Sequence, residues 1–156
     1  MTGETCFQYL LPRVRRAPSA LNRLPEIGPL KDPHPLTGRV QGQAASDLEE
    51  RFARALSRTD LGYQFQVRVR TVGGVPGQEK RIDFIVEDGP GCPVEIDGPF
   101  AHHTAAQQGA DLVREILLNE ALRRRGMLPI RRVKWWQLET QALANRLVTE
   151  IFGGGR

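Results

Sequence analysis

The chain has 156 residues, enough for one domain with a sizeable hydrophobic core. No apolar stretch approaches the ~20 residues that a membrane-spanning helix needs, so we expect no membrane partner. Much of the formal charge of +4 lies in residues 1–45, where six basic residues stand against three acidic ones, and this excess favours contact with nucleic acid or another acidic partner.

Residues 1–45 are predicted to form an extended, basic, proline-rich arm. Helices and central strands exclude repeated prolines, and this segment contains six: Pro12, Pro18, Pro25, Pro29, Pro33 and Pro35. We expect Arg13, Arg15 and Arg16 to contact nucleic acid, or the arm to lie on neighbouring proteins of a large assembly. An arginine-rich solvated tail explains the same composition equally well.

Residues 46–152 show the periodicities of a folded domain, and 153–156 are read as a flexible tail. Ser46 and Glu49 have the spacing of a capping box at the start of a helix. Apolar spacing and turn residues predict, in chain order, a helix over 46–58, strands over 63–70, 81–86 and 93–97, a helix over 105–125 ended by Gly126, a strand over 130–136 and a helix over 141–152.

This α-β-β-β-α-β-α order predicts an α/β fold with a mixed four-stranded sheet. Because a long helix separates the third and fourth strands, that pair is expected to be parallel. Alternation along 63–70 places Phe65, Val67 and Val69 on one face. In the last strand, Trp135 and Trp136 are adjacent and are therefore expected on opposite faces. The inward side of the last helix is predicted to carry Leu143, Leu147, Val148 and Ile151.

Three carboxylates are expected to meet near the third strand. Glu95 and Asp97 are two residues apart and so project from the same face of that strand, while Asp83 lies on the strand before it. Like charges gathered in a β-rich core favour a divalent cation between them. The pattern indicates a metal-dependent phosphodiesterase site or the remains of one.

The order of these elements, with Glu49 on the first helix, Asp83 on the second strand and Glu95-Ile96-Asp97 on the third, resembles the PD-(D/E)XK nuclease superfamily and its restriction-endonuclease-like core. Glu95 to Pro99 followed by His102 or His103 looks like the very-short-patch-repair endonuclease branch. The stretches 118–122, 126–127 and 133–136 are similar to the RAP domain of organellar RNA-binding proteins. The resemblance covers roughly residues 46–152.

The resemblance implies a Mg²⁺- or Mn²⁺-dependent endonuclease that hydrolyses DNA or RNA. Asp83, Glu95 and the backbone carbonyl of Ile96 would be the metal ligands, and Glu49 would reach the ion through a water. His103, or His102, would act as general base or phosphate contact. Gln107 would touch the scissile phosphate, and Trp136 would stack on a base.

One position departs from the superfamily pattern. The lysine expected two residues after the glutamate is replaced by Asp97, which cannot stabilise developing negative charge. The branch that the chain resembles commonly carries this aspartate. The one-residue offset of the histidines from the family position is a second departure.

Each of these residues also has a purely structural interpretation. Glu49 would only cap its helix, Asp83 would pair with Arg81 or Lys80, and Glu95 and Asp97 would pair with arginines of the long helix such as Arg114. Gln107 and Gln108 would face solvent. The alternative function is therefore a catalytically inactive nuclease-fold module that binds RNA or is a structural subunit of an organellar ribosome or a virus particle.

Cysteine usage bears on the compartment. The only two thiols are Cys6 and Cys92, which provide neither a disulfide framework nor a zinc site. We expect an intracellular, reducing compartment, with cytoplasm, organelle matrix and virion all compatible.

Overall fold

A mixed four-stranded sheet forms the centre of the computed structural model, which describes residues 34–71, 79–99 and 105–153, with the backbone alone for 105–107. The strands lie in the order β3 (Tyr63–Val69), β4 (Lys80–Val86), β5 (Cys92–Asp97) and β6 (Arg131–Lys134). The first three are antiparallel, and β5 and β6 are parallel. The predicted α/β class, mixed sheet and parallel last pair are confirmed.

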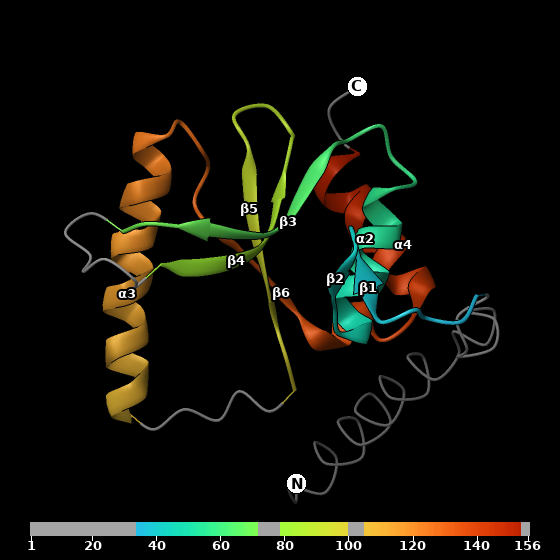
Figure 1. Cartoon of the computed structure of the whole chain (residues 1–156), viewed down its shortest axis with the longest axis horizontal. Coiled ribbons are helices and arrows are strands. Elements are labelled where there is room, and N and C mark those ends of the chain that lie inside the picture. The colour runs from blue at the N-terminus through green and yellow to red at the C-terminus, as the bar shows by residue number, and fades with distance from the viewer. Residues whose placement is uncertain (1–33, 72–78, 100–104, 154–156) are drawn as a thin grey trace, which may run out of the picture. The chain divides into compact units, whose positions relative to one another are not determined.

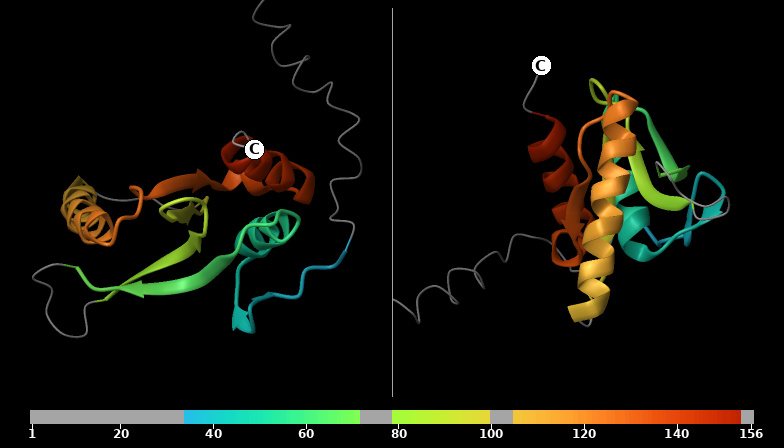
Figure 2. Two further views of the ribbon diagram at one scale, coloured as in Figure 1. Left: turned by 90° about the horizontal axis from the view of Figure 1, so that it is seen from above. Right: turned by 90° about the vertical axis from the view of Figure 1, so that its left-hand side faces the viewer.

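The helices cover both faces of this sheet. Helices α2 (Asp47–Leu56) and α4 (Gln141–Phe152) lie together on one side, and α3 (Ala105–Arg124) lies on the other (Figures 1 and 2). Two separate hydrophobic clusters result. The larger one joins α2 and α4 to the sheet through Phe52, Phe84 and Val148, and the smaller one joins α3 to it through Leu118 and Leu122.

The capping box predicted at the start of α2 is present. The Ser46 hydroxyl accepts a hydrogen bond from the Glu49 amide at 3.3 Å, and the Glu49 carboxylate accepts one from the Ser46 amide at 2.7 Å. Both contacts satisfy amides that have no partner within the helix. The helix then buries Phe52, whose ring meets Phe84 edge-on at 5.0 Å.

The face pattern expected for the first strand is wrong. Phe65 packs in the cluster of α2 and α4, whereas Val67 and Val69 pack in the cluster of α3. Between them Gln66 has φ = 53°, in the left-handed region that a non-glycine residue seldom adopts. The partner strand changes cluster at the same level, since Phe84 opposite Phe65 packs in the first cluster and Ile82 opposite Val67 in the second.

Helix α3 ends as predicted, because Gly126 has φ = 78° and supplies a left-handed residue. Its amide donates to the Arg123 carbonyl, and the Met127 amide donates to the Leu122 carbonyl. This pair of bonds is the Schellman motif. It redirects the chain from α3 into β6, which is how the crossover places β6 beside β5.

The last strand is shorter than predicted. Sheet pairing of β6 ends at Lys134, opposite Asp97, because β5 itself ends there. Trp135 and Trp136 therefore lie in a short 3-10 helix, η1 (Trp135–Leu138), and not on opposite faces of a strand. Their rings meet edge-on at 6.0 Å, and Trp136 is 53% exposed.

Part of the segment predicted as an arm belongs to the described fold. Strands β1 (Arg39–Val40) and β2 (Gln43–Ala44) form a small antiparallel hairpin, and Val40 is buried against the larger cluster. The buried carboxylate of Glu50 accepts hydrogen bonds from the amides of Thr37 and Gly38. It also forms an ion pair with Arg54. Burial opposes its ionisation, but these bonds hold the pKa of Glu50 below its ordinary value.

Replacing Glu50 by alanine is expected to lower the free energy of unfolding by about 1.5 kcal/mol, because it removes the acceptor of two backbone amides. The measurement is urea unfolding followed by circular dichroism. Glu150→Ala is the matched control, since the ion pair of Glu150 with Arg146 is exposed, and such pairs contribute less than about 1 kcal/mol. Equal effects of the two variants would contradict this role of Glu50.

Several other expectations meet the structure only in part. On α4, Val148 is buried as predicted, whereas Leu143, Leu147 and Ile151 are half-buried, and Ala144 takes the central position. The predicted turn at 73–77 lies outside the described residues. Within those residues, no helix is long and apolar enough to cross a membrane.

Candidate functional site

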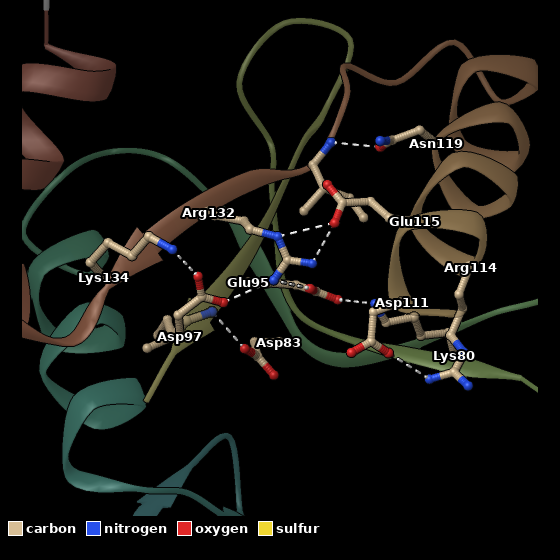
Figure 3. A network of polar contacts seen from close by, with 12 residues as sticks. Lys80, Asp83, Glu95, Asp97, Asp111, Arg114, Glu115, Asn119, Arg132 and Lys134 are labelled. Carbon is tan, nitrogen blue, oxygen red and sulfur yellow. Dashed lines mark hydrogen bonds and ion pairs between the residues drawn. The ribbon is translucent and has the colours of Figure 1, made fainter. Parts of the chain in front are cut away.

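Asp83 and Glu95 lie where β4 and β5 begin to separate. The pairing of these strands extends from Val86↔Cys92 to Phe84↔Val94, and the two acidic residues follow one step beyond. The Ile96 amide donates a hydrogen bond of 2.8 Å to a carboxylate oxygen of Asp83 (Figure 3). The side chain of Asp83 thus bridges the gap between the two strands.

The carboxyl group of Asp83 has an unusual protonation equilibrium. Burial, followed by the negative charges of Glu49 and Glu95, raises its pKa from 3.8 to about 6. The hydrogen bond from Ile96 and the charge of Arg81 act in the opposite direction without cancelling these effects. Among the described residues, Arg81 is the cation that acts on this group, and carboxyl groups with raised pKa values are concentrated at functional sites.

Glu95 and Asp97 point to the α3 side of the sheet, where cations from β4 and β6 meet them. Lys80 lies 3.2 Å from one carboxylate oxygen of Glu95, and Arg132 lies 3.3 Å from the other. Arg132 also contacts Asp97 at 2.8 Å and Glu115 of α3 at 2.6 Å, and Lys134 pairs with Asp97. Figure 3 shows this chain of alternating charges across three strands.

The protonation states of this network follow from its pairing. Although burial opposes ionisation, the hydrogen bonds from Lys134 and Arg132 hold the pKa of Asp97 below its ordinary value. Burial also opposes the charge of Arg132, but its carboxylate partners Glu115, Glu95 and Asp97 raise its pKa. Asp97 and Arg132 are therefore both charged at neutral pH.

Glu49 has the structural role that was weighed against the catalytic one. Its carboxylate accepts hydrogen bonds of 2.7 Å from both the amide and the hydroxyl of Ser46. Its charge nevertheless raises the pKa of Asp83, as the charge of Glu95 does. The structure therefore places Glu49 and Glu95 within electrostatic range of Asp83, with Glu49 engaged as a cap.

The structural interpretations of the other acidic residues named partners that differ from those observed. Lys80 pairs with Glu95, where a pair with Asp83 was considered. Arg114 of α3 pairs with Asp111 at 3.3 Å, whereas the cations on Glu95 and Asp97 come from β4 and β6. Alternate residues of β6 face alternate residues of β5, since Arg132 lies opposite Glu95 and Lys134 opposite Asp97.

Several predicted site residues stay untested. Arg13, Arg15, Arg16, His102 and His103 lie outside the described residues. Gln107 lies in the first turns of α3, with its side chain outside them as well.

A surface pocket of about 550 Å³ opens over Glu95 and Asp97. It lies between α3 and the strands β4, β5 and β6, and basic and acidic groups alternate around it: Lys80, Arg114, Arg132 and Lys134, with Asp111 and Glu115. A volume of this size admits a phosphate group with part of its sugar. Glu95 and Asp97 are the residues of β5 that line this pocket.

Asp83 and Glu95 are the carboxylates to consider as ligands of a hard divalent cation such as Mg²⁺. Among the described residues, no three histidine, cysteine or acidic side chains are grouped so as to hold a metal ion. Mg²⁺ is commonly bound by only one or two carboxylates together with waters and substrate oxygens. Asp83, whose pKa is raised, and Glu95, which is paired with Lys80 and Arg132, are the two carboxylates available here.

Comparison with known proteins supplied no relative: no family model, no curated protein and no solved structure matches this chain.

Proposed function

We propose that the chain is a metal-dependent endonuclease-like protein that acts on phosphodiester bonds of nucleic acids, with a restriction-endonuclease-like topology. The observation that carries the proposal is the placement of Asp83 and Glu95 at the separation of β4 and β5, with the pKa of Asp83 raised to about 6. A buried carboxyl group between two other acidic charges is the environment that a cation would stabilise.

In this mechanism Asp83 and Glu95 would hold the ion, with the carbonyl of Ile96 as a further ligand. Bound Mg²⁺ or Mn²⁺ polarises the phosphate and lowers the pKa of the attacking water. The water oxygen would form a bond to phosphorus while the bond from phosphorus to one ester oxygen breaks; the water would lose one proton to solvent, and the leaving ester oxygen would gain one from solvent. Lys80 and Arg132, which neutralise Glu95 without metal, would then face the anionic substrate.

The test is cleavage of mixed DNA and RNA substrates with Mg²⁺ or Mn²⁺, wild type beside Glu95→Ala. Cutting that needs the ion and is lost in the variant would support the proposal. Glu139→Ala is the control, because Glu139 is an exposed residue that follows η1. Metal-independent cutting, or equal cutting by all three proteins, would identify a contaminating nuclease.

A second function has its own supporting observation. Glu49 caps α2, and Glu95 and Asp97 are already paired with Lys80, Arg132 and Lys134. This arrangement favours a nuclease-fold module that binds RNA without cutting it, or a structural subunit of a larger assembly. Clean wild-type protein that retains nucleic acid but leaves it intact with either metal would favour this function over the first.

A further inference from the structure

We infer that two adjoining pockets between α2 and α4 bind the phosphate backbone of a nucleic acid. These two helices lie together on the side of the sheet opposite α3 (Figures 1 and 2). The surface is therefore separate from the pocket over Glu95 and Asp97, which lies against α3. The inference concerns binding alone and does not rest on the proposed cleavage.

The two pockets form one continuous surface, the α2–α4 groove, because Arg58 and Asn145 line both of them. The larger pocket, of about 540 Å³, begins at Gln141 near the start of α4, and the smaller one, of about 330 Å³, extends to Glu150. From Gln141 to Glu150 a helix rises about 13 Å. Since a nucleic-acid strand carries one phosphate every ~3.4 Å along its axis, the groove is long enough to meet several phosphates.

The lining of the larger pocket favours an anion. Among the described residues that line it none is acidic, and all carry N–H donors: His34, Arg54, Arg58, Gln141 and Asn145. A guanidinium group presents several donors in a planar fork that matches the oxygens of a phosphate. An anionic ligand would therefore enter a site of matching charge and hydrogen-bonding groups.

Arg58 is the cation that is available to such a ligand. Its side chain is exposed, and no hydrogen bond or ion pair joins it to another described residue. Arg54 has a structural role instead, since its guanidinium group donates hydrogen bonds to the carbonyls of His34 and Pro35. Glu50 lies 2.8 Å from Arg54 and balances its charge. The charge of Arg58 has no such counterpart among the described residues.

The smaller pocket supplies a second cation and uncharged donors. Arg146 of α4 lies 3.1 Å from Glu150, the acidic residue of this pocket, in an exposed ion pair. Such pairs are weak, so a phosphate can compete for the guanidinium group. The oxygen of Asn145 accepts a hydrogen bond from Gln141, which leaves its amide group to donate to a ligand. Hydroxyl and amide groups commonly contact phosphates beside arginines.

The experiment measures binding of the full chain to a labelled single-stranded oligonucleotide of mixed sequence in EDTA, by fluorescence anisotropy. Arg58→Ala is expected to raise Kd about tenfold at low salt, because a charge-assisted hydrogen bond is lost. The slope of log affinity against log salt concentration is expected to become shallower by about 0.7, the contribution of one phosphate on a single strand. Absence of binding by wild type would overturn the inference.

Arg125→Ala is the matched control, because it removes the same charge from an exposed arginine just after α3. It is expected to leave Kd and the salt slope close to those of wild type. Equal effects of the two variants would show that only net charge matters and would overturn the inference.

A measurement on wild type avoids any effect of a substitution on folding. Phenylglyoxal modifies accessible arginines, and saturating oligonucleotide is expected to slow the modification of Arg58 and Arg146 but not that of Arg125. Peptide mass spectrometry gives the rate at each position. Equal rates at Arg58 with and without oligonucleotide would contradict its contact with the ligand.

Competition identifies the source of the phosphate. Unlabelled oligonucleotide and inorganic phosphate are compared at equal phosphate concentration and equal ionic strength. The oligonucleotide is expected to displace the labelled strand far more effectively, because it meets several donors of the groove at once. Equal displacement would indicate a site for a single phosphate group and would overturn the assignment to a nucleic acid.

The inference and the proposed function can fail separately. If wild type cuts with Mg²⁺ while Arg58→Ala binds as tightly as wild type, the inference fails and the nuclease stands. If wild type does not cut but its binding depends on Arg58, the inference stands and the function without cleavage is favoured.

Discussion

Replacement of Asp83 by asparagine is expected to reduce metal-dependent cleavage by about 10³-fold, because the variant loses a charged ligand while keeping its shape. Asparagine retains a carbonyl oxygen that can accept the hydrogen bond now given by the Ile96 amide. The local path of β4 and β5 is therefore expected to persist. The measurement is kcat for a labelled oligonucleotide at saturating substrate with Mg²⁺.

The same replacement is expected to leave nucleic-acid affinity unchanged or improved, because it removes a negative charge from a site that approaches phosphates. Asp88→Asn is the matched control: it makes the same chemical change at an exposed turn residue. Unaltered cleavage by Asp83→Asn would exclude Asp83 as a metal ligand and with it the mechanism proposed here. Loss of binding together with cleavage would indicate a folding defect instead.

Local sequence signals predicted most of the fold. The capping box of Ser46 and Glu49, the alternation in the strands and the glycine at 126 all act within a few residues. The order of elements then set the parallel pairing of β5 and β6. The small hairpin of β1 and β2 escaped prediction because Pro33 and Pro35 dominate the composition just before it, whereas the strands themselves contain no proline.

Features that depend on tertiary context were predicted wrongly. Gln66 lies in a regular alternation of apolar and polar residues. The local sequence therefore does not predict its positive φ or the change of face at Val67. The end of β6 is set by the end of its partner β5, which sequence periodicity in β6 alone does not report. Trp136 consequently lies in η1, and its role as a base-stacking residue stays a prediction.

The acidic residues of the candidate site were found from spacing, but their partners were not. Ion pairs between strands depend on register, and the register between β5 and β6 is fixed by a crossover of more than thirty residues. One signal was present: Arg132 and Lys134 have the same two-residue spacing as Glu95 and Asp97. In parallel neighbouring strands, such matched spacing places opposite charges on one face.

The raised pKa of Asp83 predicts an unusual dependence of stability on pH in metal-free buffer. The ordinary value is 3.8 and the folded value is about 6, so between these two pH values the folded protein binds more protons than the unfolded chain at this group. Stability contributed by Asp83 therefore falls as pH rises from 4 to 6, by up to about 3 kcal/mol. Asparagine at this position has no proton to lose.

The free energy of unfolding of Asp83→Asn relative to wild type is accordingly expected to increase by up to about 3 kcal/mol between pH 4 and pH 7 in EDTA. Urea unfolding of both proteins at each pH measures it. Glu50 and Asp97, whose lowered pKa values act in the opposite direction, are present in both proteins and cancel. A difference independent of pH would contradict the raised pKa.

Millimolar Mg²⁺ separates the two functions in the same experiment. An ion held by Asp83 and Glu95 stabilises the ionised carboxylate of folded wild type, so at pH 7 it is expected to reduce the advantage of Asp83→Asn. A module that binds nucleic acid without a metal would show the same advantage with and without Mg²⁺. If Mg²⁺ reduces the difference, Asp83 is a metal ligand whose ionised carboxylate the ion stabilises. If the difference is unchanged, the ionised carboxylate lowers the stability of the fold and Mg²⁺ does not compensate for it.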